Sequence, residues 1–325
     1  MKSNSDIQEI INIFETKDNF LLTSHTDPDG DSVGSVIGLA NFLKSLGKKV
    51  VMFNEGHLPE RYKFLDPDGR INFEPLDPDF KPEIVVILEC PEIGRIGFVQ
   101  DFITDGMMIV NIDHHPKNTR YGDINYIDES ACAVAEVLFQ IIRSNNHEIA
   151  PAVAEPFYAA IASDTGRFKF TNTDSKCFRV ASELVKAGAN PKAIADKIFS
   201  SHRPGTIKLL GKLLEKLELY NNGKICVLKL KLKDLEQYGV EVADTEGIID
   251  YSLVIAGVKV GILFKEKDES TVKVGLRSQN GIDISKYARS KGGGGHVNAA
   301  GFTVNESFEE AVNVVISEVA KFLNG

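Results

Sequence analysis

The 325-residue sequence has few cysteines and no long apolar segment. Its four cysteines, Cys90, Cys132, Cys177 and Cys226, lie far apart and form no CxxC pair, so a disulfide framework is not expected. They are instead interpreted as core residues or free thiols in a reducing compartment. No stretch approaches a membrane-spanning helix, and residues 1–16 lack the apolar centre of a signal peptide. We therefore expect a soluble, cytoplasmic protein with no membrane partner.

A surplus of basic residues is also missing, because the formal net charge is -9. Proteins that bind long nucleic acid neutralise many phosphates with a basic surface. A long duplex is therefore not expected as a partner, whereas a local basic pocket for a small phosphorylated substrate is compatible with this charge. With 43% hydrophobic residues, the chain can bury a substantial core, and its length favours two domains.

Short, continuous apolar runs separated by helical segments indicate a mostly parallel sheet in the first part of the chain. The runs cover residues 20–24, 49–53, 83–88 and 107–112. Such runs are typical of strands buried on both faces, so we predict an α/β domain with a doubly wound, mostly parallel sheet. In open sheets of this kind, ligands bind beyond the carboxyl ends of the strands.

Helical spacing predicts a helix after the first strand, with Asp31 or Ser32 as its N-cap and Gly47 at its end. Further helices are predicted over 131–143, 151–162 and 191–217, the last broken near Arg203-Pro204.

The later part of the chain is predicted to form a smaller α+β domain. A turn at Asn221-Asn222-Gly223 precedes its first strand. Its other elements are strands over 224–230, 258–264 and 271–276, a helix near 245–255, and a final helix capped by Ser307 with Glu310. The predicted division is a first domain over 1–190, a helical linker over 191–218 and a second domain over 219–325. We expect the active site in the cleft between the two domains.

The most distinctive pattern is H-x3-D-x-D, formed by His25, Asp29 and Asp31 in the loop after the first strand. One imidazole and two carboxylates in seven residues can converge on one cation. This mixture suits manganese, iron, cobalt or zinc better than calcium. Asp-Pro-Asp-Gly is also an ordinary turn sequence and Asp31 can cap a helix, so this pattern alone leaves a turn and a metal site about equally favoured.

Two further candidate segments follow a predicted strand and a predicted helix. Asp113-His114-His115 comes after the strand over 107–112, and Asp164 comes directly before Thr165-Gly166. Each segment alone has an ordinary explanation, either as a buried core histidine or as a turn cap. Their joint occurrence with the first pattern favours a metal centre.

Glu89 closes a continuous apolar run. A strand-end carboxylate can simply reach water, but burying it without a partner would be costly, and a metal would remove that cost. We favour the metal, because this strand should neighbour the others. With Asp29, Asp31 and Asp164, the carboxylates then suffice to balance two divalent cations. Paired cations are the usual means of attacking a phosphate ester.

In the second domain, residues 291–301 form a glycine-rich run that contains His296. Glycines permit close backbone approach and leave N–H groups able to cradle an anion. A flexible linker is the ordinary alternative. Arg277 ends a predicted strand and most often would face solvent, but beside such a cradle it is a candidate phosphate clamp.

Together these segments resemble the DHH phosphoesterase family, including its C-terminal associated domain with the motif G-G-G-H-x-x-A-A-G. The resemblance covers nearly the whole chain and is carried by residues 25–34, 113–115, 163–168, 277–278 and 292–301. The two-domain length is similar to the branch that acts on short oligonucleotides and on 3′-phosphoadenosine 5′-phosphate (pAp).

The resemblance implies a site with two divalent ions, manganese first and magnesium or cobalt as alternatives. One ion would be held by His25, Asp29 and Glu89, and the second by Asp31, Glu89, His114 and Asp164. His115 would lie near the scissile phosphate, and Asp113 would support the metal ligands without binding an ion itself. The substrate would be bound by Arg277, Ser278, Gly293, Gly294, Gly295 and His296.

The family usually has Asp where Glu89 stands, so the extra methylene is expected to weaken one of the two ions. The implied activity is hydrolysis of short oligoribonucleotides, linear dinucleotides such as pApA, or pAp. The alternatives are a cyclic-dinucleotide phosphodiesterase, a pyrophosphatase-like enzyme and a non-catalytic nucleotide-binding regulator. The sequence leaves a homodimer open.

Overall fold

The computed structural model describes residues 4–73, 80–245, 247–279 and 281–324. Of residues 4, 5, 243, 296 and 324 it describes the backbone alone. The chain forms two compact units, unit 1 up to Ser201 and unit 2 from His202. The division falls inside the segment 191–218.

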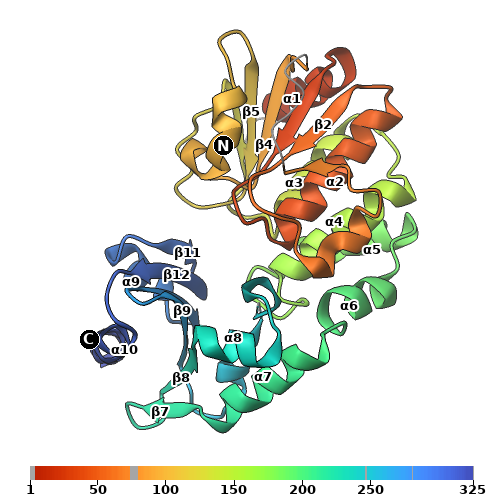
Figure 1. Cartoon of the computed structure of the whole chain (residues 1–325). Coiled ribbons are helices and arrows are strands. Elements are labelled where there is room, and N and C mark those ends of the chain that lie inside the picture. Colours follow the sequence, from red (N-terminus) through yellow and green to blue (C-terminus); the bar gives the residue numbers. More distant parts are fainter. Residues whose placement is uncertain (1–3, 74–79, 246, 280, 325) are drawn as a thin grey trace. The chain divides into compact units, whose positions relative to one another are not determined.

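Unit 1 is built on a six-stranded parallel sheet in the order β3-β2-β1-β4-β5-β6 (Figure 1). This confirms the predicted parallel sheet. The strands are β1 Phe20–Thr23, β2 Val50–Phe53, β3 Ile71–Asn72, β4 Ile84–Leu88, β5 Met108–Asp113 and β6 Ile124–Ile127.

Both faces of this sheet are buried, as the continuous apolar runs require. Alternate residues of a strand point to opposite faces. Phe20 and Leu22 therefore join the larger core cluster beneath the helices, whereas Leu21 packs with Val99 on the other face. The helices are α1 Asn4–Thr16, α2 Gly30–Ser45, α3 Val134–Ser144, α4 Pro151–Asp164, α5 Ser175–Lys186 and α6 Pro191–Phe199. The 3₁₀ segments are η1 Glu60–Leu65 and η2 Ile93–Phe102.

Helix α1 is not predicted from the sequence, because residues 1–16 contain many polar and acidic side chains. Its apolar residues nevertheless recur at helical spacing, and Ile10, Ile11 and Phe14 are fully buried. The helix therefore contributes one amphipathic face to the core of unit 1.

Helices α2 and α4 pack closely because α2 presents glycines to its neighbour. A Cβ atom on Gly34 would lie 2.4 Å from the backbone oxygen of Pro156, and one on Gly38 would lie 2.3 Å from the Phe157 ring. This approach brings the first turn of α2, with Asp31, toward the last turn of α4, with Asp164.

The sequence predicted Asp31 or Ser32 as the N-cap of α2, but the N-cap is Asp29. Its carboxylate accepts a hydrogen bond of 3.0 Å from the backbone N–H of Ser32. The predicted caps are therefore inside the first helical turn. The Asp31 side chain is left to make other contacts.

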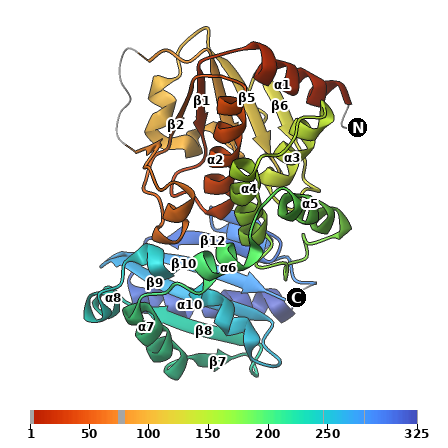
Figure 2. The ribbon, with the colours of Figure 1, turned by 90° about the vertical axis from the view of Figure 1, so that its right-hand side faces the viewer.

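Unit 2 contains a second sheet in the order β11-β12-β10-β9-β8-β7, in which the β8–β9 pair is parallel and the other pairs are antiparallel (Figure 2). The predicted α+β character is confirmed. The strands are β7 Glu218–Tyr220, β8 Ile225–Leu230, β9 Val260–Asp268, β10 Thr271–Ser278, β11 Gly294–His296 and β12 Ala299–Val304.

Helices cover both faces of the second sheet and form two separate core clusters. One cluster includes α10 and the other includes α7. The helices are α7 Pro204–Glu215, α8 Leu232–Tyr238, α9 Ile284–Ser290 and α10 Phe308–Asn324. The helix predicted near 245–255 is instead two 3₁₀ segments, η3 Val242–Thr245 and η4 Ile248–Val254. The predicted break near Arg203-Pro204 separates α6 from α7.

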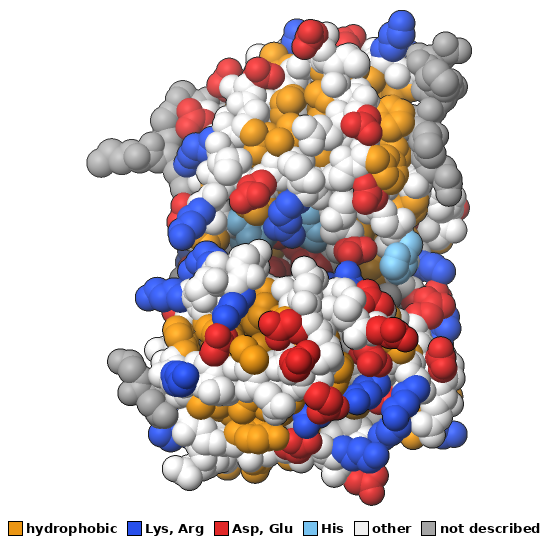
Figure 3. Space-filling view, turned by 60° about the vertical axis from the view of Figure 1, so that its left-hand side comes forward, with side chains coloured by type: hydrophobic (Ala, Val, Ile, Leu, Met, Phe, Trp, Pro, Cys, Tyr) orange, Lys and Arg blue, Asp and Glu red, His pale blue; other side chains and the backbone are white. Residues whose placement is uncertain are grey.

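The surface drawn in Figure 3 intermixes acidic and basic side chains, and on that face the described residues form no continuous basic area. This distribution agrees with the negative net charge. Among the described residues, no helix combines the length and the apolar character needed to cross a membrane.

Candidate metal centre

The candidate site lies at the carboxyl edge of the parallel sheet, where the strand order reverses between β1 and β4. Ligands of open α/β sheets bind at this point. His25 follows β1, Glu89 directly follows β4, and Asp113 ends the neighbouring strand β5. The topology thus gathers three of the predicted segments, and α4 adds Asp164 at its last position.

The first ligand group contains His25, Asp29 and Glu89. Nε2 of His25 lies 2.7 Å from Oε2 of Glu89 and 4.0 Å from Oδ2 of Asp29. Nδ1 of His25 lies 2.7 Å from the backbone oxygen of Thr26. Because a carbonyl can only accept, Nδ1 carries the proton there, and Nε2 faces the two acids.

The second ligand group contains Asp31, His114 and Asp164. Nε2 of His114 lies 3.9 Å from Oδ2 of Asp31 and 3.8 Å from Oδ2 of Asp164. Nδ1 of His114 lies 3.1 Å from the backbone oxygen of Ala131, which orients the ring in the same way as in His25.

Asp31 is held by the start of helix α3. Its Oδ2 accepts a hydrogen bond of 2.6 Å from the N–H of Val134, and its Oδ1 accepts one of 3.3 Å from Ala135 and one of 2.8 Å from Ser35 Oγ. N–H groups at a helix N-terminus stabilise a carboxylate. These hydrogen bonds fix the carboxylate of this candidate ligand in place.

Glu89 connects the two groups. Its Oε2 faces His25, whereas its Oε1 lies 3.7 Å from Nε2 of His114 and 3.4 Å from Nδ1 of His115. The side chain is only 2% exposed, and its backbone has a φ of 56°. This left-handed conformation is uncommon for a residue other than glycine and is frequent at functional sites.

His115 is oriented by Asp113. Oδ1 of Asp113 lies 2.9 Å from Nδ1 of His115, and Oδ2 accepts a hydrogen bond of 2.7 Å from Asn118 Nδ2. Asn118 also donates to the backbone oxygen of Cys90, next to Glu89. Asp113 Oδ1 also accepts a hydrogen bond of 2.7 Å from the backbone N–H of His114, and its support of the metal ligands stays a prediction.

Burial and close contact between charged groups shift the pKa values of the acids and histidines in the two ligand groups. Burial raises the pKa of Asp31 to about 6 and that of Asp164 to about 8, although the charge of His114 lowers both. Burial lowers the pKa of His25, but the charge of Glu89 outweighs this and raises it to about 9. Burial would raise the pKa of Glu89, yet the charges of His115 and His25 hold it well below the usual range.

These properties fit divalent cations. The donor atoms of each group lie within 4.8 Å of one another, and they combine imidazole nitrogen with carboxylate oxygen. Burial raises the pKa values of Asp31 and Asp164 because the charge of His114 compensates it only in part. A cation at each group would supply the remaining positive charge.

Uncharged residues that sequence reasoning missed complete the site. Ser32 Oγ donates a hydrogen bond of 3.0 Å to Oε2 of Glu89 and lies 3.0 Å from Nε2 of His25. Asn172 Nδ2 lies 3.2 Å from Oδ2 of Asp164. Ser32 directly follows the H-x3-D-x-D pattern, which is a weak signal. Asn118 and Asn172 lie in loops without any distinguishing pattern.

The candidate substrate residues of unit 2 are partly engaged within that unit. Arg277 donates from Nε to Asp250 Oδ1 at 3.0 Å and from Nη1 to the backbone oxygen of Leu276 at 3.1 Å. Ser278 Oγ donates to the backbone oxygen of Ile282 at 2.7 Å and accepts from Asn298. Their contact with substrate stays a prediction.

Within the glycine-rich run, residues 294–296 form the edge strand β11, which pairs with the start of β12, and turns lie on both sides of β11. Close approach requires two glycines of the run. A Cβ atom on Gly293 would lie 2.1 Å from the oxygen of Gly301, and one on Gly295 would lie 2.4 Å from that of Ala299. At Gly294 there is space for a side chain. The side chain of His296 lies outside the described part of the structure.

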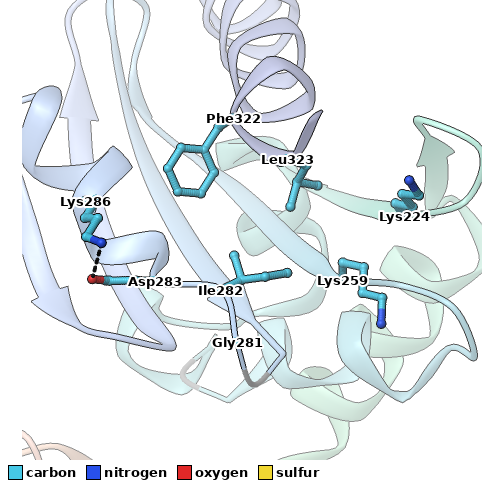
Figure 4. A pocket seen from close by; sticks show the side chains of 8 residues that line it. All are labelled: Lys224, Lys259, Gly281, Ile282, Asp283, Lys286, Phe322 and Leu323. Carbon is cyan, nitrogen blue, oxygen red and sulfur yellow. Dashed lines mark ion pairs between the residues drawn. The ribbon is translucent and has the colours of Figure 1, made fainter. Parts of the chain in front are cut away.

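A concave region of about 520 Å³ lies elsewhere in unit 2 (Figure 4). Its apolar floor includes Phe322, and lysines stand around it. Lys286 is paired with Asp283 at 3.7 Å, and in Figure 4 the amine of Lys259 points away from the Phe322 ring. This arrangement does not focus positive charge on one point, in contrast to the convergent donors of unit 1.

Comparison with known proteins agrees with this geometry. The DHH family, N-terminal domain matches residues 19–161, and the DHHA1 domain matches residues 222–325. A probable bifunctional oligoribonuclease and PAP phosphatase NrnA from Streptococcus mutans is 30% identical over 289 residues, which cover 87% of this chain and 89% of that protein.

A second relative is the bifunctional oligoribonuclease and PAP phosphatase NrnA of Thermus thermophilus, which is 29% identical over 92% of this chain and 90% of its own. An exopolyphosphatase-related protein from Bacteroides fragilis has a similar fold, with a TM-score of 0.91 at 24% identity, over 99% of this chain and 98% of that one. The chain belongs to the DHH family and carries the DHHA1 domain. It is accordingly a phosphoester hydrolase.

Proposed function

We propose that the protein hydrolyses short oligoribonucleotides, linear dinucleotides of the pApA type and pAp, with two divalent cations, manganese foremost. The observation that carries this proposal is the position of Glu89, whose two oxygens face different ligand groups. The names of the relatives, oligoribonuclease and PAP phosphatase, support this choice of substrates.

In this proposal, His25, Asp29 and Glu89 hold one ion, and Asp31, Glu89, His114 and Asp164 hold the other. The ions would supply activation of water and stabilisation of charge on the phosphate. The chain's own contribution is to fix these donors, because the N–H groups of α3 and the backbone oxygens of Thr26 and Ala131 set the carboxylate and ring orientations.

His115 has the properties of a hydrogen-bond donor to the reacting phosphate. Burial lowers its pKa, but the charge of Glu89 and the hydrogen bond with Asp113 outweigh this and raise it. Nδ1 is directed to Asp113, and Nε2 is the atom proposed to donate a hydrogen bond to a phosphate oxygen. Arg277 is proposed to bind a phosphate that does not react.

The deciding experiment is a product analysis with manganese present, using pAp, pApA, cyclic di-AMP, pyrophosphate and RNA of increasing length. We expect turnover of pAp and pApA, and rates that fall as RNA lengthens, because the net charge of -9 gives no general attraction for a polyanion.

Each other outcome of this assay identifies a different activity. Preference for cyclic di-AMP would indicate a cyclic-dinucleotide phosphodiesterase, and preference for pyrophosphate a pyrophosphatase-like enzyme. Faster processive decay of long RNA would indicate an exonuclease. Manganese binding without any turnover would indicate a nucleotide-binding regulator.

A further inference from the structure

We infer that Lys176 is a positioning residue for only one of the two ions, and that it acts through Glu136 and the segment 128–134. This segment contacts Asp31 and His114 of the second ligand group directly, and Asp164 through Asn172. The inference rests on the proposed two-ion function. It adds a residue, on helix α5, that touches neither ion nor substrate.

Two ligands are fixed by the backbone of the segment. The oxygen of Ala131 lies 3.1 Å from Nδ1 of His114 and sets the orientation of its ring. Three residues further on, the N–H of Val134 donates a hydrogen bond of 2.6 Å to Oδ2 of Asp31. A shift of this backbone would therefore move both ligands together.

The third ligand is connected through Asn172. Its Nδ2 lies 3.0 Å from the backbone oxygen of Cys132, in the middle of the segment, and 3.2 Å from Oδ2 of Asp164. One amide thus links the segment to the carboxylate at the end of α4. The three ligands share a single support, although they come from α2, the loop after β5, and α4.

Glu136 holds the backbone of the segment 128–134 in position. Its Oε2 accepts a hydrogen bond of 3.0 Å from the N–H of Cys132, and its Oε1 lies 2.7 Å from Nζ of Lys176. Glu136 is buried, with 1% of its side chain exposed, whereas Lys176 is 30% exposed, so loss of Lys176 leaves the buried carboxylate without its cationic partner. Nζ of Lys176 is also 3.6 Å from Asp128, at the start of the segment.

The first ligand group is supported elsewhere. His25 is oriented by the backbone oxygen of Thr26, and Asp29 by the N–H of Ser32. Ser32 Oγ adds a contact to Glu89. These supports belong to the loop after β1 and the start of α2. Loss of Lys176 should therefore act on the two ions unequally.

The experiment measures manganese binding to the metal-free full-length protein by calorimetry, in two backgrounds. Asp29→Asn weakens manganese binding at the first ligand group, so that binding at the second group can be measured. Asp164→Asn weakens binding at the second group, so that the first can be measured. In the Asp29→Asn background, Lys176→Met should weaken binding by about 10- to 100-fold, the usual effect of losing an outer partner of a ligand. In the Asp164→Asn background, Lys176→Met should leave the manganese affinity of the first ligand group unchanged.

Two further variants and a control sharpen the comparison. Lys176→Arg keeps the charge and should restore most of the affinity. Glu136→Gln keeps an oxygen for Cys132 and removes the ion pair, so it should reproduce Lys176→Met in a milder form. The control is Lys192→Met, because Lys192 forms a pair with Asp196 and is 83% exposed, and it should change neither isotherm.

Equal weakening in both backgrounds would overturn the inference, since it would indicate a general loosening of unit 1. Unchanged binding in both would overturn it too. Unfolding temperatures of the metal-free variants identify a folding defect, and Glu136→Gln then decides the question. Failure of the proposed function has a different signature, because wild-type protein would then turn over none of the proposed nucleotides.

Discussion

The two units differ in how their candidate functional side chains are held. In unit 1, the ligand side chains are mostly buried, and backbone groups or neutral side chains fix their orientation. In unit 2, the side chain of Arg277 is 24% exposed and is paired with Asp250, which is 46% exposed. A partly exposed ion pair contributes little and can be exchanged for a phosphate. A buried ligand set cannot be rearranged so readily.

This difference indicates a division of labour. Catalysis by cations requires donors fixed in advance, whereas binding of nucleotides that differ in length tolerates adjustable contacts. We therefore expect substitutions in unit 1 to change metal affinity and turnover, and substitutions in unit 2 to change substrate affinity.

The largest effect should follow from His114→Ala, because Nε2 of His114 faces Asp31, Glu89 and Asp164 at once. Turnover should fall by about 100-fold or more, in excess of what outer partners contribute. The control is His147→Ala, since His147 pairs with Glu15 and lies outside the ligand groups. Initial rates with pApA measure both variants, and near-normal turnover of His114→Ala would remove the metal assignment of unit 1.

Glu89→Gln should abolish binding of one of the two ions. The amide keeps the shape but removes the charge that balances the cations, so calorimetry with manganese should show one bound ion in place of two. Glu89→Asp should keep both ions and tighten the weaker one, because the shorter side chain relieves the bridge. An isotherm of Glu89→Gln identical to that of the wild type would contradict this prediction.

Arg277→Ala should raise the KM for a dinucleotide by about 10- to 100-fold and change kcat little, consistent with about 1.5–3 kcal/mol for a hydrogen bond to a charged group. Lys273→Ala is the matched control, because Lys273 is an exposed cation on the same strand. Steady-state kinetics separate the two parameters. If kcat falls and KM stays constant, the division of labour between the units is wrong.

The last prediction concerns the dependence of metal binding on pH. In metal-free unit 1 the pKa is about 9 for His25 and about 8 for Asp164, so both carry protons at pH 7. An entering cation must displace them, and manganese affinity should rise between pH 7 and 9, by up to about tenfold per unit for each proton released. Calorimetry in buffers of different ionisation enthalpy measures this release. Binding without proton release would show that the ligands are already deprotonated.

The sequence predicted those parts of the fold whose signals are local and continuous. The apolar runs that became β1, β4 and β5 are recognisable because a central parallel strand is buried on both faces. The two-residue strand β3 and the mixed sequence Ile-Asn-Tyr-Ile of β6 carry no such run. Both are edge strands of the sheet, and their formation depends on tertiary contacts that a short stretch of sequence does not reveal.

The charged candidates of the site came from the sequence, but their supports did not. Imidazoles and carboxylates after strands have few ordinary roles in combination. Ser32, Asn118 and Asn172 are polar residues of a kind common in any loop, and only the fold shows which ligand each one contacts. The cap of α2 was misassigned for a similar reason, because Asp29, Asp31 and Ser32 are all good capping residues.

The most direct test of the central claim is a crystal structure of the wild-type protein soaked in manganese, with anomalous scattering to locate the ions. The account predicts two peaks in unit 1, one at His25 and Asp29 and the other at Asp31, His114 and Asp164. It also predicts that Glu89 contributes one oxygen to each ion. A single peak, or two peaks with Glu89 turned away from both, would contradict it.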